Sequence, residues 1–197
     1  MGGRVVILAS GSGSNAQALL DRADLGAEIV AVVSDVPDAG VLDRARSAGV
    51  EPVCVDRKAF PDRPHWERAL AEEVARRAPD LVVLAGFMRI LSADFVRRWP
   101  ILNVHPSLLP AFPGARAVED ALAHGVKVTG VTVHFVVEEV DAGPIVVQDV
   151  AAVRPDDTPE TLHARLKEIE HRLLPESVAL FCAGRLAVDG RHVRILT

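Results

Sequence analysis

The chain has 197 residues, of which 49% are hydrophobic and 25% charged, and its formal net charge is −5. This composition supports a folded domain with a sizeable core, and the acidic balance argues against bulk nucleic-acid binding, which usually leaves a basic footprint. Two cysteines are too few for a disulfide framework or a cysteine-based metal site. No apolar run approaches the roughly 20 residues that span a bilayer, and none resembles a secretion signal. We therefore expect one domain over residues 1–197, no membrane or nucleic-acid partner, and a cytoplasmic location.

The first predicted element is a buried strand over residues 4–9, apolar after its first position as in parallel sheets. A Gly-rich turn and a helical pattern follow it. Such a unit leaves backbone N–H groups and the positive end of a helix dipole pointing at an anion. The turn also fits the dinucleotide pattern Gly-x-Gly-x-x-Ala at Gly11, Gly13 and Ala16, with Asp35 after the next strand. An enzyme that uses a nicotinamide dinucleotide is therefore an alternative.

Strands and helices alternate through the next part of the chain. This alternation is typical of an α/β fold with an open, mostly parallel twisted sheet, helices on both faces and ligands beyond the carboxyl ends of the strands. Periodicity and turn residues predict a strand over 28–34, a helix over 41–48, a strand over 52–55, a helix over 66–78, a strand over 81–85 and a helix capped by Ser92 through Trp99.

A short apolar strand over residues 101–105 ends in the most informative side chains. Asn103 and His105 are two positions apart, so they share a face of an extended strand, and Pro106 then ends it. An amide offers fixed N–H donors and an imidazole can carry a proton near neutral pH. The pair therefore suits a carbonyl oxygen that is becoming an oxyanion. The structural alternative is a core histidine beside a turn-forming asparagine.

The C-terminal part contains the strands that we expect to be antiparallel. We predict a helix over 117–124, an alternating strand over 126–136, an acidic turn, a strand over 145–150, a helix from the N-cap Thr158 to about Leu174 that continues over 177–181, and a closing hairpin around Asp189-Gly190.

Three motifs together point to a known family. The run Asn-Val-His-Pro-Ser-Leu-Leu-Pro at 103–110, the run Gly-Phe-Met-Arg-Ile-Leu at 86–91 and the turn Gly-Ser-Gly-Ser-Asn at 11–15 resemble those of the folate-dependent formyltransferases. The second and third motifs resemble, more specifically, those of the members that formylate phosphoribosylglycinamide in purine biosynthesis. The resemblance extends over nearly the whole chain. It implies a Rossmann-like formyltransferase fold, 10-formyltetrahydrofolate as co-substrate, no metal, and a monomer or homodimer.

The resemblance also implies roles for individual residues. We expect Asn103 and the protonated His105 to stabilise the oxyanion, and Asp141 to raise the pKa of His105 and assist proton transfer. The implied substrate-binding residues are Gly13, Ser14, Asn15 and Glu170; the implied folate-binding residues are Arg63, Met88, Arg89, Ile90, Leu91, Asn103, Val140 and Asp141. The segment that begins at Arg116 lacks the histidine of many relatives, and we assign no role to it.

Two alternatives stay open beside the dinucleotide enzyme. One is another formyl-folate enzyme, either a hydrolase that releases formate or a transferase that acts on an amino sugar. The other is a nucleotide-binding module without catalysis. The joint presence of Asn103, His105 and Asp141 argues against both the module and the dinucleotide enzyme.

Overall fold

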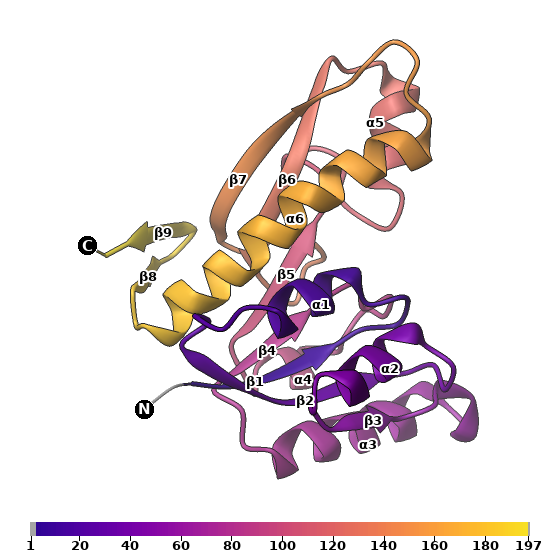
Figure 1. The fold of residues 1–197 in the computed structure, drawn as a ribbon, viewed down its shortest axis with the longest axis vertical. Helices are drawn as coiled ribbons and strands as arrows, with labels where there is room; N and C mark the ends of the chain where they lie inside the picture. Colours follow the sequence, from indigo (N-terminus) through magenta and orange to yellow (C-terminus); the bar gives the residue numbers. More distant parts are fainter. Residues whose placement is uncertain (1–2, 197) are drawn as a thin grey trace.

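The described residues, 3–196 of a computed structural model, form nine strands that share one sheet (Figure 1). In chain order they are β1 (Gly3–Leu8), β2 (Ala27–Ser34), β3 (Pro52–Cys54), β4 (Leu81–Leu84), β5 (Ile101–His105), β6 (Val128–Phe135), β7 (Ile145–Ala152), β8 (Leu186–Asp189) and β9 (His192–Ile195). Across the sheet the order is β3-β2-β1-β4-β5-β6-β7-β9-β8.

The direction of the strands divides the sheet into two parts. Strands β3, β2, β1, β4 and β5 are parallel to one another. Strands β5, β6 and β7 pair antiparallel, as do β8 and β9. Within residues 3–196, a single parallel ladder pair, Ile145 with His192, joins the last hairpin to β7. The prediction of a mostly parallel α/β sheet with antiparallel strands toward the C-terminal part is confirmed.

Helices cover both faces of this sheet. They are α1 (Ser14–Leu20), α2 (Gly40–Ser47), the 3-10 turn η1 (Arg57–Ala59), α3 (Arg63–Arg76), α4 (Ala93–Val96), α5 (Ala117–His124) and α6 (Pro159–Cys182). Successive side chains of a strand point to opposite faces. Accordingly Val5 and Ile7 of β1 pack into the cluster that includes α1, α2 and α6, whereas Val6 and Leu8 pack into the cluster under α3.

Several helix bounds differ from the prediction, by one to three residues, and the larger differences have local causes. Helix α3 begins at Arg63 because the Asp62 side chain accepts a hydrogen bond from the backbone N–H of His65 and caps it. Helix α4 ends at Val96, before Trp99. Helix α6 continues through Pro175 to Cys182 as one element. Among the described residues, no helix is both long and apolar enough to cross a membrane.

Candidate active site

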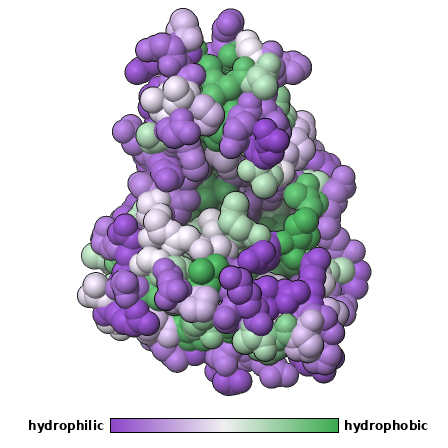
Figure 2. All heavy atoms as spheres, turned by 90° about the vertical axis from the view of Figure 1, so that its right-hand side faces the viewer, coloured by the Kyte–Doolittle hydropathy of each residue, from purple (hydrophilic) through white to green (hydrophobic). Residues whose placement is uncertain are grey.

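A cavity of about 640 Å³ opens beyond the carboxyl ends of β1, β4 and β5. From β1 the chain adds β2 and β3 on one side of the sheet and then β4 and β5 on the other. Open α/β sheets bind ligands at such a switch point, where the cavity lies. Figure 2 shows this side of the molecule, with apolar residues in a hollow between its upper and lower parts. The walls are the glycine turn 11–15, the loop 86–91, the end of β5, the turn around Asp141 and one face of α6.

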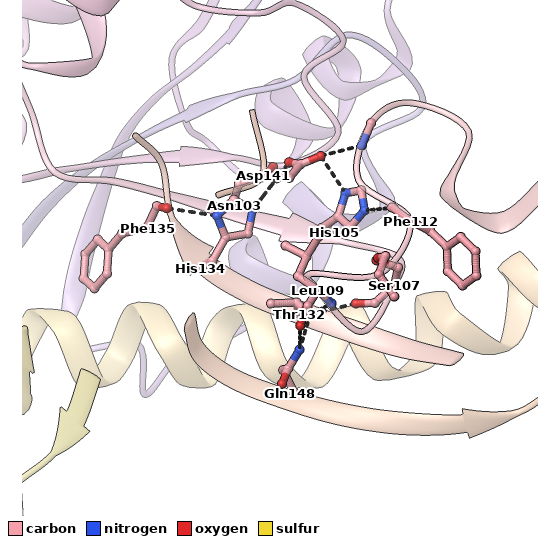
Figure 3. Close-up of polar contacts among 12 residues, drawn as sticks. Asn103, His105, Ser107, Leu109, Phe112, Thr132, His134, Phe135, Asp141 and Gln148 are labelled. Atoms are coloured by element: carbon pink, nitrogen blue, oxygen red, sulfur yellow. Dashed lines mark hydrogen bonds and ion pairs between the residues drawn. The ribbon is translucent and has the colours of Figure 1, made fainter. Parts of the chain in front are cut away.

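Asn103, His105 and Asp141 meet on one side of this cavity (Figure 3). The Nδ1 atom of His105 lies 3.5 Å from an oxygen of Asp141, and the Nε2 atom of His134 lies 3.6 Å from the other oxygen. Asn103 faces His134 across the β5–β6 pair, with 3.1 Å between Nδ2 and Nε2. The structure therefore brings the three predicted catalytic residues together and adds His134, a buried neighbour of two of them.

Both ring nitrogens of His105 face oxygen atoms. Nε2 lies 2.9 Å from the carbonyl oxygen of Phe112, and because a carbonyl can only accept, Nε2 carries the hydrogen. Burial lowers the pKa of His105 below its ordinary value of 6.5, although the Phe112 carbonyl and the charge of Asp141 act in the opposite direction. Asp141 thus raises the His105 pKa as predicted, but the net shift is downward.

Asp141 is held in its ionised form. Burial alone would raise its pKa, but the nearby His134 ring, the backbone N–H of Gly114 and the charge of His105 together lower it below 3.8. The Gly114 N–H donates to Oδ2 over 2.7 Å. The backbone of Asp141 is left-handed, with φ of 54°, an uncommon conformation for a residue with a side chain.

The glycine turn has the geometry of an anion site. Gly13 precedes α1 with φ of 79°, and a Cβ atom there would lie 2.5 Å from Val41. The first helical hydrogen bond is that of the Gln17 N–H to Gly13, so the N–H groups of Ser14 and Asn15 have no helical partner. Gly13, Ser14 and Asn15 line the cavity, as the prediction of an anion-binding turn requires.

Glu170 faces the same end of the cavity from α6. Its carboxylate accepts a hydrogen bond of 2.7 Å from Nδ2 of Asn15. Burial raises the pKa of Glu170 above 4.5, and the Asn15 hydrogen bond opposes this only in part. Lys167 and His163, one and two helical turns before Glu170, also line the cavity. Sequence reasoning missed both, although the i, i+3 and i+7 spacing from Glu170 could have indicated them.

The loop 86–91 forms the opposite wall. The side chains of Met88 and Ile90 are largely exposed, and Val140 across the cavity is half-exposed, so the rim is apolar. Arg63, predicted to contact the acidic folate tail, does not line the cavity in this structure. Instead its Nη2 atom donates to the carbonyl oxygen of Ile90 over 2.6 Å.

Asp35 bears on the dinucleotide alternative. In that alternative its carboxylate would bind a ribose hydroxyl. The Asp35 side chain is fully buried and accepts a hydrogen bond of 2.6 Å from Nε of Arg89. The carboxylate is thus committed to a protein cation, which argues against a dinucleotide at this turn. Among residues 3–196, no cluster of histidine, cysteine, aspartate or glutamate could hold a metal ion.

Known proteins are similar to this chain in sequence and fold over nearly its whole length. A family model described as formyl transferase matches residues 3–178. The phosphoribosylglycinamide formyltransferase of Mycobacterium tuberculosis is 46% identical, with 98% of this chain and 94% of that protein covered. The trifunctional purine biosynthetic protein adenosine-3 of Bos taurus is 45% identical over 95% of this chain, which spans only 19% of that protein's length. Glycinamide ribonucleotide transformylase 1 from Symbiobacterium toebii superimposes with a TM-score of 0.95 at 48% identity, covering 99% and 94% of the two chains.

Proposed function

The chain belongs to the formyl transferase family, and from this premise we propose that it transfers a formyl group from 10-formyltetrahydrofolate to the amine of phosphoribosylglycinamide, a step of de novo purine biosynthesis. One observation carries the proposal. The cluster of Asn103, His105 and Asp141 lies between an anion-binding turn and an apolar-rimmed loop in a single cavity. A phosphate-bearing amine and a flat formyl donor would meet at that cluster.

The two ligands would occupy opposite ends of the cavity. The substrate phosphate binds the N–H groups of Gly13, Ser14 and Asn15, with the ammonium of Lys167 nearby, and Glu170 accepts from the ribose hydroxyls. The folate lies at the other end. Its heterocycle contacts the backbone of Met88, Arg89, Ile90 and Leu91, and its linker lies against Val140. Its acidic tail extends out of the cavity toward Arg63, which lies beside Ile90 outside the cavity lining.

The transfer needs one nucleophilic attack and one proton relay. The amine attacks the formyl carbon, a C–N bond forms, and the carbonyl oxygen becomes an oxyanion that accepts a hydrogen bond from the amide of Asn103. The amine proton moves to Nδ1 of His105, which carries no hydrogen in the neutral ring. Asp141, 3.5 Å from Nδ1, then stabilises the imidazolium. The intermediate then collapses: the bond from carbon to folate nitrogen breaks, and that nitrogen takes the proton.

A reconstituted reaction tests the proposal. Purified protein is incubated with 10-formyltetrahydrofolate and phosphoribosylglycinamide, and tetrahydrofolate and the formylated amide are quantified. We expect both products in equal amounts and neither when the amine is omitted. Release of tetrahydrofolate and formate without the amine would instead identify the hydrolase alternative. Transfer of the formyl group to an amino sugar would identify the amino-sugar transferase. The cytoplasmic location, the metal-free chemistry and the state as monomer or homodimer stay predictions of the sequence.

A further inference from the structure

Two buried carboxylates take no part in the chemistry described above. Asp35 follows β2, Glu67 lies on α3, and each is less than one-tenth exposed. Burying a carboxylate costs free energy unless a cation or hydrogen bonds compensate for it. Both find their partners in the same short segment, residues 86–92, of which 86–91 line the cavity.

Each carboxylate holds this segment at a different point. Oδ2 of Asp35 accepts from Nε of Arg89 over 2.6 Å, and Oε1 of Glu67 accepts from the backbone N–H of Ser92 over 2.5 Å. Hydrogen bonds of this kind, with an ionised partner, are shorter and stronger than neutral ones. Because Asp35 and Glu67 lie on separate elements, the segment is held from two directions.

Further contacts fix the residues between these two points. The backbone N–H of Met88 donates to Oγ of Ser10 over 2.9 Å, and Nη2 of Arg63 donates to the Ile90 carbonyl over 2.6 Å. Nε of Arg63 lies 4.0 Å from Oε2 of Glu67, so Glu67 also restrains the arginine that reaches the segment.

These contacts leave other backbone N–H groups of the segment available to a ligand. Within residues 3–196, the backbone N–H groups of Arg89, Ile90 and Leu91 make no hydrogen bond to another protein atom. Three consecutive free N–H groups on a restrained backbone can pair with the acceptor atoms of a flat heterocycle. A segment that is ordered before binding also loses less conformational entropy when the ligand arrives.

We infer that Asp35 and Glu67 are positioning residues for the formyl-folate, which act through the segment 86–92 by holding its free N–H groups in place. This inference rests on the proposed function, because it names the part of the protein that sets the affinity for that co-substrate. It also gives a role to Asp35, the residue that the dinucleotide pattern singled out and the transfer chemistry does not use.

Two variants and one control test the inference. Asp35→Ala and Glu67→Ala each remove one anchor, and Glu73→Ala removes a carboxylate from the far end of the same helix α3, where it pairs with Arg76 and Arg77. Titration calorimetry gives the Kd of tetrahydrofolate and of phosphoribosylglycinamide for each protein. Hydrogen–deuterium exchange, measured without ligand, reports on the segment 86–92.

We expect the Kd of tetrahydrofolate to rise roughly tenfold in both anchor variants, as for loss of one charge-assisted hydrogen bond, with the Kd of phosphoribosylglycinamide changed less than about twofold. Exchange of the segment should accelerate in the anchor variants and not in Glu73→Ala. Equal weakening of both ligands would show a merely structural role and overturn the inference, as would unchanged exchange of the segment.

A second pair of variants covers the case in which the alanine variants do not fold. Asp35→Asn and Glu67→Gln keep the side-chain shapes and remove only the charges. The same selective rise in the tetrahydrofolate Kd is expected, at about threefold, and no rise contradicts the inference. If the unmodified protein binds no tetrahydrofolate, the proposed function fails, whereas the exchange experiment still decides whether the two carboxylates order the segment.

Discussion

Each catalytic side chain is oriented by a contact with a neighbouring strand or loop. His134 contacts the amide of Asn103, and the Phe112 carbonyl accepts a hydrogen bond from His105 (Figure 3). The backbone N–H of Gly114 donates to Asp141. These holding contacts come from neighbouring strands and loops rather than from the substrates. The groups are therefore oriented before any ligand arrives, which is the condition for effective stabilisation of developing charge.

Asn103→Ala should lower kcat by about 10²- to 10³-fold, because one donor to the oxyanion is lost. KM for both substrates should change little, since the amide acts mainly on charge that develops during the reaction. Steady-state kinetics check this. The matched control is Gln148→Ala, whose amide bonds to Leu109 and Thr132 outside the cavity and whose loss should leave kcat within severalfold. Full activity in Asn103→Ala would remove the oxyanion role.

Asp141→Asn should lower the pKa of His105 further below 6.5. Burial already depresses this pKa, and the negative charge of Asp141 is one of the two contributions that oppose burial. An NMR titration of the His105 ring in both proteins measures the change. The histidines with exposed rings serve as internal references, because they should titrate alike in both. An unchanged or raised His105 pKa would contradict the electrostatic link.

Glu170→Gln should make the protein more stable at neutral pH while weakening phosphoribosylglycinamide binding. The folded-state pKa of Glu170 is raised above 4.5 by burial, so the folded state resists ionisation. This cost is absent below the unfolded pKa and fully present above the folded one, so wild-type stability declines as pH rises through that window. The Tm advantage of the variant should therefore grow between pH 4.5 and 8. A constant difference across that range would contradict this reasoning.

At the scale of elements, the site is built from strand ends and the turns that follow them. The end of β5 supplies Asn103 and His105, the turn after β1 supplies the N–H groups, and the turn before β7 supplies Asp141. Two of these turns need a left-handed residue, Gly13 and Asp141. Backbone conformation at these positions is thus part of the functional geometry.

Gly13→Ala should damage the anion-binding turn, whereas Gly11→Ala should not. An alanine at Gly13 would need φ of 79° and would place Cβ 2.5 Å from Val41 of α2, while a Cβ at Gly11 meets nothing within 4 Å. Left-handed strain of this kind costs about 1–3 kcal/mol. We expect a lower Tm and a raised KM for phosphoribosylglycinamide in Gly13→Ala alone. Calorimetry measures Tm and steady-state kinetics measures KM. Similar Tm and KM values for the two variants would contradict this explanation.

At the scale of the whole molecule, distant parts of the chain close one cavity. Asn15 and Glu170, near opposite ends of the sequence, share a buried hydrogen bond of 2.7 Å. In Figure 1, α6 runs beside α1 and along the β5–β6–β7 part of the sheet, and it thereby joins the two parts of the molecule. A ligand that contacts both parts should stabilise the entire fold.

Phosphoribosylglycinamide and tetrahydrofolate should each raise Tm, and NAD should not. A ligand that binds only the folded state adds about 2.7 kcal/mol of stability at 100 times its Kd. Thermal-shift measurements with the three compounds separate the proposed function from the dinucleotide alternative. Gly13→Ala is the control, because it should reduce the shift by phosphoribosylglycinamide while leaving that by tetrahydrofolate. Stabilisation by NAD alone would reverse the assignment.

The amino-acid sequence by itself determined the features that depend on neighbouring residues. Alternating apolar runs and turn residues predicted the strands of the sheet, and two-residue spacing placed Asn103 beside His105, because strand geometry is local. Helix ends were less predictable. The start of α3 depends on the Asp62 cap, and the passage of α6 through Pro175 depends on packing along its length.

Only the tertiary structure decided which distant groups meet and how buried they are. Asp141 lies in the turn between the antiparallel strands β6 and β7 and contacts His105. Arg89, in the loop after β4, forms an ion pair with Asp35, which follows β2. The sequence predicted the sign of the effect of Asp141 on the His105 pKa, but burial, which sets the net direction, arises only when the loop 106–115 packs over the ring. Desolvation is a property of the assembled surroundings, and no local pattern of residues encodes it.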